Sequence, residues 1–517
     1  MRRPHRESQQ HGTPITYPAP FRGWVDSDNA AMPTPGGAAV LDNMLPTRTG
    51  ARVRGGSQFV STVPAAVDQL ITYDDGINEF LFAVSDGKIH NASALDGSAA
   101  PVVQSGLGSG EIVSTQFNTV ADTYLYVVGG TGSPRLFDGS TWQTVTDVSS
   151  PISITGATGP FSAVWSFKSR LFFAKGMQVY FLPTGEAGGA ASDLNLAGVF
   201  KNGGRILFGT SWSSDSGAGF GDRCIIATDR GEIAVFEGSD PASASDWALV
   251  GRYVIPPILG PNAHLRVGGD VLIATTEGLL PVSGIVSKDP LAVSSIAISR
   301  PIAVAWRRAV ALALTSWQVR RWPSAGVILI GRPDAADLWG VYAETGAWFR
   351  ITGWDAATAI TFKGRVMFAG KGGIVRQGDT TGQDDGEPFV ARCRWQPSPQ
   401  PAAGIKVAQL ARATLNGEGD PCFSLSFVNS TSQASAMLPD PWVPGDAGSL
   451  WDSGVWDQMT WTSGMADLGV IQSMWRSVSK TGGLLAPEIQ IVSDNDLPIK
   501  AELLSVDAII EGGGIVG

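Results

Sequence analysis

The sequence predicts a mainly β protein in which a β-propeller of six or seven blades is inserted between an extended N-terminal arm and a C-terminal antiparallel β-sandwich or platform. Three observations predict this class. Glycine, proline and tryptophan number 64, 32 and 17 among 517 residues, while only 16% are charged, which is typical of short strands joined by tight turns. A hairpin pattern recurs through the middle of the chain, and alternating apolar stretches recur in its last part.

Composition also excludes several classes of protein. Hydrophobic residues make up 43% of the chain, too many for a disordered polymer, and the periodic Ala/Glu/Lys/Leu-rich runs of a helical bundle are missing. The three cysteines, Cys224, Cys393 and Cys422, have neither the number nor the spacing of a disulfide framework or a zinc site. The longest apolar stretch, residues 302–314, contains two arginines, so we expect no membrane insertion, and the polar start predicts no signal peptide.

Residues 1–50 are expected to form an extended N-terminal arm. Prolines at positions 14, 18, 20, 33 and 35 disfavour both a helix and a central strand. Two alternatives remain open: a free arm, or an arm that lies on another subunit through its apolar side chains. The candidates for such a contact are Phe21, Trp24, Val40, Leu41 and Leu45.

Residues 51–385 carry an internal repeat with a period of roughly 40–50 residues, the spacing of propeller blades. In each copy a short apolar strand ends in Ala or Gly, and a turn leads into a second apolar strand. Turn pairs such as Asp-Gly and Glu-Gly fit hairpins, because primed turns need positive φ. The seven copies read EFLFAVSDGKIH, TYLYVVGG, SRLFFAKGMQVYF, RCIIATDRGEIAVF, DVLIATTEGLLPV, GVILIGRPDAADLWGVY and RVMFAGKGGIVR.

Three details refine the repeat. The small residue before each turn, such as Ala83 or Ala174, fits a crowded position facing a central channel. A strand within residues 52–60 is expected to close the ring beside the last hairpin, because closure protects sheet edges. Pro301, followed by apolar residues at spacings of three and four, predicts an inserted helix of about three turns with Leu312 on its apolar stripe.

Residues 386–517 follow a polar linker and are expected to form the platform domain. Alternating stretches predict strands at 389–395, 405–415, 423–428, 489–492 and 499–510, hence an antiparallel sandwich or open sheet. A tryptophan-rich loop with few aliphatic residues separates its halves. Subunit contact is the favoured explanation, with packing inside the loop and stacking on sugars as alternatives. The tryptophans are Trp442, Trp451, Trp456, Trp461 and Trp475.

Charge is unevenly distributed along the chain. The net charge is −10, with +3 on residues 1–54 and −7 on residues 386–517. An acidic body disfavours tight nucleic-acid binding but suits a surface past which DNA slides. Ordinary solubility explains the same balance. The candidates for lining a DNA channel are Asp452, Asp457 and Asp467.

Signatures of catalysis or cofactor binding are missing from the sequence. None of the four histidines stands at metal-ligand spacing, and neither a phosphate-binding glycine loop nor a Gly-x-Ser-x-Gly elbow occurs. We therefore expect no enzyme, no cofactor and no metal. The run Asp138-Gly139-Ser140-Thr141-Trp142 is similar to the Asp-box turn of sialidase-type propellers, although a purely structural turn is the favoured explanation.

Several passages together resemble one family. They are PAPFRGWVDSDNAAMPTPGGAAVLDNMLPTRTGARVRGG near the start, AISRPIAVAW, VYAETGAWFRITGW and FAGKGGIVRQGDTTGQDDGEPFVARCRW further on, and APEIQIVSDNDLPIKAELLSVDAIIEGGGIVG at the end. This set resembles the tail nozzle protein, or tail tubular protein B, of short-tailed bacteriophages. The motifs are loose patterns and not catalytic signatures.

The resemblance implies a structural virion protein. In that family a propeller is inserted into the chain, the N- and C-terminal parts pack as a platform, and six copies form a ring below the portal and adaptor. The resemblance also implies a conduit for double-stranded DNA during ejection, a docking surface for tail fibres or spikes, and assembly in the host cytoplasm. The alternative is a glycan-binding or glycan-hydrolysing propeller of a tail fibre or depolymerase. That function would need paired carboxylates or an arginine cluster that converges on the propeller axis.

Overall fold

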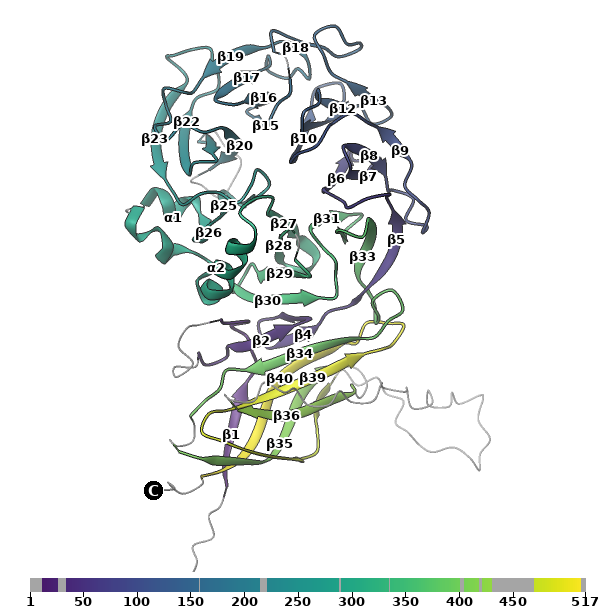
Figure 1. Ribbon diagram of the computed structural model, residues 1–517, viewed down its shortest axis with the longest axis vertical. Coiled ribbons are helices and arrows are strands. Elements are labelled where there is room, and N and C mark those ends of the chain that lie inside the picture. The colour runs from purple at the N-terminus through teal and green to yellow at the C-terminus, as the bar shows by residue number, and fades with distance from the viewer. Residues whose placement is uncertain are drawn as a thin grey trace, which may run out of the picture. The chain divides into compact units, whose positions relative to one another are not determined.

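The computed structural model describes residues 12–26, 34–157, 159–213, 221–287, 290–333, 335–399, 404–417, 421–429 and 469–512. The protein is mainly β, with many small sheets and few helices (Figure 1). It divides into two compact units. Unit 1 comprises Met1–Gln58, Val341–Gly353 and Asp379–Gly517, and unit 2 comprises Phe59–Gly340 and Trp354–Gly378.

Unit 2 consists of small antiparallel sheets that follow one another along the chain. The first contains β6 (Gln69–Asp74), β7 (Glu79–Ser85), β8 (Lys88–Asn91) and β9 (Val102–Gln104). The second contains β10 (Ile112–Asn118), β11 (Thr123–Gly129), β12 (Arg135–Phe137) and β13 (Trp142–Thr144). The third contains β15 (Ala163–Phe167), β16 (Arg170–Lys175), β17 (Gln178–Phe181) and β19 (Ser192–Asn195). The fourth contains β20 (Ile206–Trp212), β21 (Arg223–Thr228), β22 (Glu232–Glu237) and β23 (Ala248–Val254).

Three more sheets complete the series. The fifth contains β24 (His264–Val267), β25 (Asp270–Thr275) and β26 (Gly278–Pro281). The sixth begins with β27 (Gln318–Trp322), β28 (Val327–Gly331) and β29 (Asp337–Tyr342). The seventh contains β31 (Thr358–Phe362), β32 (Arg365–Ala369), β33 (Ile374–Thr381) and β5 (Gly56–Thr62). A short parallel pair, β14 (Ile154–Thr155) and β18 (Gly189–Ala190), lies apart from them. The strand expected beside the last hairpin is thus confirmed as β5, which pairs with β33.

The first strands of these seven sheets lie next to one another in a closed cycle. Each first strand contacts the first strand of the next sheet along the chain, and the last of them, β31, contacts β6. In chain order these strands are β6, β10, β15, β20, β24, β27 and β31. Figure 1 shows the strands β6, β10, β15, β20, β27 and β31 facing a common centre. Unit 2 therefore has an inner layer made of one strand from each sheet.

The seven hairpins expected from the repeat are confirmed as the second and third strands of the sheets. The expected place of the small residues before the turns is wrong. Ala83 and Ala174 are fully buried, but they lie on second strands, where they pair with Leu70 and Ala163 of the first. There they pack in apolar clusters between neighbouring sheets and do not face the centre. A small side chain lets two sheets approach closely, which explains the recurrence of Ala and Gly.

A helical segment separates the fifth and sixth sheets. It contains α1 (Val282–Ser287), η1 (Pro290–Ile296), η2 (Arg300–Ile302) and α2 (Ala303–Leu312), and a further turn, η3 (Pro323–Ala325), follows β27. Trp306 and Ala309 are buried, as the apolar spacing predicted. Leu312 is instead 89% exposed, because α2 ends there and Ala313 already has an extended backbone. None of the helices among the described residues has the length and hydropathy that a bilayer-spanning segment requires.

Unit 1 combines strands from three separate stretches of the chain. One sheet contains β3 (Met44–Pro46), β4 (Ala51–Val53), β40 (Ala501–Gly512), β35 (Lys406–Gly417) and β37 (Gly469–Gln472), with β1 (Thr13–Pro18) paired to β40 and β38 (Arg476–Gly482) paired to β35. A second set runs in the order β30 (Ala347–Thr352), β2 (Ala38–Asp42), β34 (Phe389–Trp395), β39 (Leu485–Ser493) and β36 (Phe423–Asn429). Tyr17 of β1 contacts Trp395 and Phe427 of this second set, with ring centroids 6.5 and 6.0 Å apart.

The described part of the expected N-terminal arm is incorporated into these sheets. Thr13 of β1 stands opposite Ile510 of β40, and Leu41 of β2 stands opposite Cys393 of β34. The prolines at the two ends of β1 are compatible with pairing because β1 pairs with β40 alone and so occupies an edge. The chain ends thus supply strands to one shared unit where the sequence predicted an arm.

Arg54 joins the three stretches of unit 1. Its side chain is fully buried. Its Nη2 donates to Asp384 Oδ2 at 2.6 Å and to the Thr352 carbonyl at 3.0 Å. Nη1 donates to Asp384 Oδ1 and to the Gly55 carbonyl, and Nε donates to Asn43 Oδ1. All five N–H groups of the guanidinium therefore have acceptors, which offsets the cost of burying its charge.

Glu488 is a second buried charge of unit 1. Arg392 donates to its Oε2 at 3.0 Å, Arg394 also pairs with that oxygen, and Gln490 donates to Oε1 at 2.7 Å. Burial raises the pKa of the Glu488 carboxyl, but the hydrogen bonds from Arg392, Arg394 and Gln490 outweigh that effect and hold the pKa below its usual value. The carboxylate is thus stabilised in its charged form.

Candidate functional site

The inner layer of unit 2 surrounds a cavity of about 460 Å³. Each of the seven first strands contributes to its lining. Gly209 of β20 lies against the indole of Trp165 on β15, and a Cβ atom at that position would overlap the ring. A glycine is therefore required for β20 to approach β15 so closely.

Arg320 is one of two arginines that line this cavity. It extends from β27, is partly accessible from the cavity, and has no carboxylate partner among the described residues. Its Nη2 donates to Asn262 Oδ1 at 3.2 Å. The Gln69 amide is oriented so that its nitrogen donates to the Ile112 carbonyl, and Arg320 Nη2 then also donates to the Gln69 side-chain oxygen at 3.1 Å. Burial lowers the pKa of Arg320 to about 10, so the guanidinium is still charged at neutral pH.

Arg266 of β24 is the second arginine that lines the cavity. Its Nη1 donates to the Ser211 hydroxyl at 3.1 Å, and its Nε donates to the Gly268 carbonyl at 3.4 Å. Among the described residues that line the cavity, none is an aspartate or a glutamate. The lining therefore carries positive charge without an opposite charge beside it.

His264 lies two residues before Arg266 on β24 and stacks on Phe208, with ring centroids 3.8 Å apart and an interplanar angle of 11°. Its Nδ1 lies 2.9 Å from the Pro261 carbonyl. Burial and the nearby charge of Arg320 lower the pKa of His264 to about 4. The imidazole is therefore neutral at pH 7 and adds no charge to the cavity.

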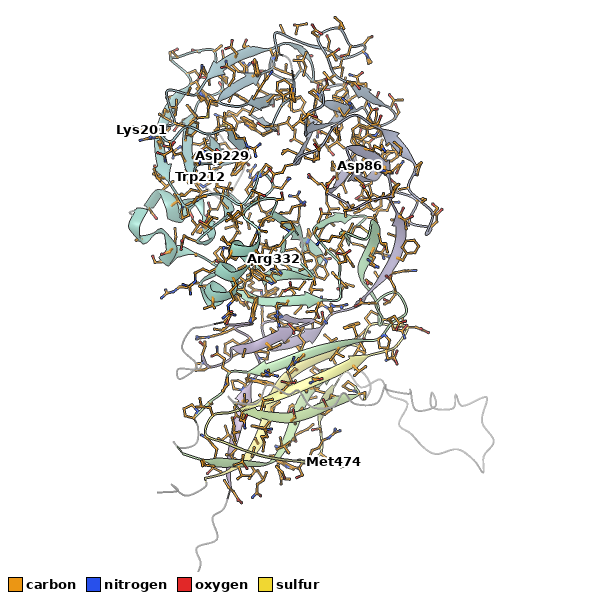
Figure 2. All side chains as sticks on the ribbon, viewed as in Figure 1. Asp86, Lys201, Trp212, Asp229, Arg332 and Met474 are labelled. Carbon is orange, nitrogen blue, oxygen red and sulfur yellow. The ribbon has the colours of Figure 1, made fainter. Side chains whose placement is uncertain are left out.

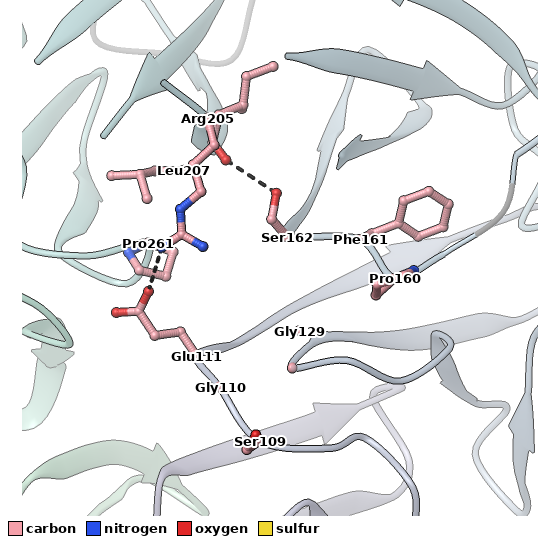
Figure 3. Close-up of a pocket in the computed structure, with 12 residues that line it drawn as sticks. Ser109, Gly110, Glu111, Gly129, Pro160, Phe161, Ser162, Arg205, Leu207 and Pro261 are labelled. Atoms are coloured by element: carbon pink, nitrogen blue, oxygen red, sulfur yellow. Dashed lines mark hydrogen bonds and ion pairs between the residues drawn. The ribbon is translucent and has the colours of Figure 1, made fainter. Parts of the chain in front are cut away.

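A second cavity, of about 290 Å³, lies where β10, β15 and β20 begin (Figure 3). Figure 3 shows Arg205 and Glu111 pointing toward each other, with an Nη2–Oε2 distance of 3.5 Å. Arg205 also pairs with Asp229, and Glu111 accepts a hydrogen bond from Ser316 at 3.0 Å. The charges here are balanced, in contrast to those of the larger cavity.

The residues proposed for subunit contact in the arm have different environments. Trp24, Leu41 and Leu45 are buried in unit 1, where Arg350 lies over the Trp24 ring at 5.0 Å, so these three side chains are not available to a neighbouring subunit. Phe21 is 39% exposed. Burial follows from the pairing of β2 and β3 in the sheets of unit 1, which the sequence pattern did not reveal.

The other predicted site residues lie outside the described residues, with one exception. Those outside are Trp442, Trp451, Trp456, Trp461, Asp452, Asp457 and Asp467. Trp475 is described, is 40% exposed and lies 4.7 Å from the Arg412 guanidinium. It is close along the chain to Met474, which is 87% exposed and labelled in Figure 2.

Other candidate features are structural. Asp138 accepts hydrogen bonds from the backbone and hydroxyl groups of Ser140 and Thr141, which closes the turn. Within the described ranges no three His, Cys, Asp or Glu side chains are placed to hold a metal ion. Arg266 and Arg320, which lie on different strands, were not predicted as site residues from the sequence. The adjacent arginines in QVRRW, within an otherwise apolar strand, are the signal that could have identified the second.

Comparisons with known proteins give no family assignment. No family model and no curated protein matches the chain. One solved structure with partial similarity is PorZ, a surface component of the type-IX secretion system of Porphyromonas gingivalis, with 12% identity over 62% of this chain and 38% of PorZ and a TM-score of 0.36. Another is Raptor of Chaetomium thermophilum, with 13% identity over 63% of this chain and 29% of Raptor and a TM-score of 0.40. The computationally designed protein Ika8 is similar over 62% of this chain and 99% of its own, at 12% identity and a TM-score of 0.35. The chain spans less than half of PorZ and of Raptor, and similarity at these scores supports no functional conclusion.

Proposed function

We propose that this chain is a structural subunit of a bacteriophage tail nozzle, of the tail tubular protein B type. In this proposal unit 2 is a seven-bladed β-propeller and unit 1 is an antiparallel β-sandwich that acts as the platform. The closed cycle of seven first strands supports seven blades. The pairing of β5, from the start of the chain, within the seventh sheet supports ring closure by an early strand.

One observation carries the proposal: both ends of the chain build unit 1, and unit 2 is inserted between them. β1 and β4 pair with β40, and β2 pairs with β34. The family that the sequence resembles has this same order, with an inserted propeller and terminal segments packed as a platform. An arrangement in which the chain ends support each other suits a subunit that must stay folded under load in a particle.

The chemistry of unit 2 favours a structural role over glycan hydrolysis. Most glycosidases use two carboxyl groups on either side of the scissile bond. The described lining of the larger cavity has none, and the single glutamate of the smaller cavity, Glu111, is paired with Arg205. A glycan-binding role without hydrolysis is the second candidate, because Arg266 and Arg320 line the same cavity.

As a nozzle, six copies would surround a channel for double-stranded DNA below the portal and adaptor, and their outer surface would receive tail fibres or spikes. The excess of acidic residues suits this role, because each phosphate neutralised by a protein cation adds affinity that would slow transit. No cofactor is needed for such a function.

The test is the size and symmetry of the purified full-length protein, measured by light scattering and electron microscopy over a range of concentrations. The proposal predicts a six-fold ring of about 325 kDa, six times the 54.1 kDa chain mass. Microscopy of the parent particle with a tagged chain should place the tag at the tail. A tag located elsewhere in the particle, or a different rotational symmetry, would contradict the proposal.

A further inference from the structure

We propose that the larger of the two cavities described above, the one of about 460 Å³ that the inner layer of unit 2 surrounds, binds the oxyanion group, a carboxylate, phosphate or sulfate, of a small acidic ligand. The inference rests on the side chains of the cavity. It holds whether the chain is a monomer or a ring subunit, so it does not depend on the nozzle proposal.

The positive charge of the described cavity lining has no carboxylate beside it. Arg320 and Arg266 both line the cavity, and neither has a carboxylate partner among the described residues. Withdrawing a cation from water is costly unless an opposite charge or a full set of acceptors replaces the solvent. The cost is visible in the pKa of Arg320, which burial lowers to about 10.

Other arginines of this protein show what a compensated charge looks like. Arg54 pairs with Asp384, and Arg205 pairs with Glu111 and Asp229. Arg332 of unit 2, labelled in Figure 2, pairs with Asp337. The fold thus supplies carboxylates to arginines in several places, but not to the two in the larger cavity.

Each of the two cavity arginines has a side-chain nitrogen whose N–H groups have no acceptor in the described part of the chain. Nε of Arg320 and Nη2 of Arg266 have no acceptor among the described residues, since the hydrogen bonds of these side chains involve their other nitrogens. A guanidinium presents its N–H groups in a planar fork that matches the oxygens of carboxylate, sulfate and phosphate. Both side chains reach the cavity from neighbouring strands, because β24 contacts β27.

The volume and the polar lining of the larger cavity suit a small ligand. A volume of about 460 Å³ lies within the range of about 300–1,000 Å³ that is common for small-molecule sites. The rest of the lining offers neutral hydrogen-bonding groups, among them Ser114, Thr115, Ser166 and Thr210. Such a wall can bind the hydroxyl groups of a ligand whose acidic group is held by the arginines. The smaller cavity, in which Arg205 already has carboxylate partners, offers no such site for an anion.

The experiment is a titration of the full-length protein with three probes at constant ionic strength: inorganic phosphate, sulfate and glucuronate. Binding is measured by isothermal titration calorimetry and by the shift of the thermal unfolding temperature, with chloride as the reference salt. We expect at least one probe to bind and to raise the unfolding temperature. Preference for glucuronate would identify a sugar acid as the ligand class, and preference for phosphate or sulfate would identify an inorganic or esterified oxyanion.

Variants separate a specific site from general salt effects. Arg320→Gln and Arg266→Gln should each weaken binding tenfold or more, while Arg365→Gln, at an exposed position on β32, should leave the dissociation constant unchanged. If Arg320→Gln fails to fold, Arg266→Gln alone decides the question. The proposal is overturned if none of the probes binds the folded wild-type protein at 20 mM or below (roughly the limit of weak binding). It is also overturned if the folded cavity variants bind as tightly as the wild type.

Discussion

Unit 1 is stabilised by contacts between distant parts of the chain, whereas unit 2 is stabilised mainly by contacts between neighbours. In unit 1, Thr13 stands opposite Ile510, and Arg54 bonds to both Thr352 and Asp384. In unit 2 nearly every sheet is formed from consecutive strands, and apolar clusters fill the spaces between adjacent sheets. The same chain therefore contains one unit that requires both chain ends and one that is assembled largely from local hairpins.

Buried ions are paired in both units, and the exceptions lie in the larger cavity of unit 2. Within unit 2, the buried Glu232 pairs with Arg252, and Arg332 pairs with Asp337. In unit 1 the buried ions Arg54 and Glu488 have opposite charges within hydrogen-bonding distance. In unit 2 the cavity arginines, Arg266 and Arg320, do not. Compensated ions specify how segments fit together, while uncompensated ions at a cavity are suited to binding a charged partner. The cavity arginines therefore differ from the other buried ions of unit 2 as well as from those of unit 1, which is the basis for the proposed anion site.

The largest expected effect is that of deleting residues 1–50. The deletion removes β1, β2 and β3 and uncovers core that Leu41 and Leu45 now fill, so unit 1 should lose its cooperative structure while unit 2 stays folded. Hydrogen–deuterium exchange read separately for residues 59–340 and 379–512 measures this. Unchanged protection in the second range would show that the chain start is dispensable for unit 1.

Substitution of Arg54 should have the next largest effect. Arg54→Met leaves Asp384 and Asn43 without their main donor, which should cost about 3–5 kcal/mol of unfolding free energy, confined to unit 1. Arg52→Gln is the matched control. Its ion pair with Asp379 is partly exposed, so it should cost less than about 1 kcal/mol. Denaturant unfolding monitored in each unit compares the two, and equal losses would refute the special role of Arg54.

Acid should weaken unit 1 through Glu488. Because its pKa is lower in the folded protein than in the unfolded chain, its stabilising contribution is complete above about pH 4.3 and is lost as the pH falls through the folded-state pKa. Glu488→Gln should destabilise unit 1 at pH 7 by roughly 2–3 kcal/mol. It should also flatten the acid limb of the stability curve. An identical acid limb in the wild type and the variant would assign the pH dependence to other groups.

A smaller effect is expected from enlarging a residue between two sheets of unit 2. Ala174→Leu overfills the cluster between the third and fourth sheets and should cost about 1–3 kcal/mol, with unit 1 unaffected. Ala121→Leu, at an exposed position, is the control and should be close to neutral. Thermal unfolding of the two variants gives the comparison. Equal unfolding temperatures would mean that Ala174 is not closely packed.

The sequence predicted the local part of this fold well. The seven hairpins, the strand β34 at 389–395 and the pairing of β5 beside the last hairpin were all predicted, because turn residues and alternation are encoded within a few positions. The pairing of β1 with β40 was not predicted, since nothing near residues 13–18 identifies a partner almost 500 positions away. A proline-rich edge strand and a proline-rich arm have the same composition.

The cavity was missed for a similar physical reason. Arg266 and Arg320 belong to separate repeats, and only the approach of β24 to β27 brings them into one lining. Ala83 was misplaced because a small residue fits both a channel wall and a close contact between sheets, and alternation along one strand does not distinguish the two. Leu312 fits the apolar spacing of α2, but the helix ends at that residue.

In the proposed nozzle ring, unit 1, built from both chain ends, mediates assembly. The most direct measurement is hydrogen–deuterium exchange of the full-length protein in its assembled and dissociated forms. We expect the protection gained on assembly to be concentrated in residues 12–58, 341–353 and 379–512. Protection confined to residues 59–340, with unit 1 unchanged, would contradict it.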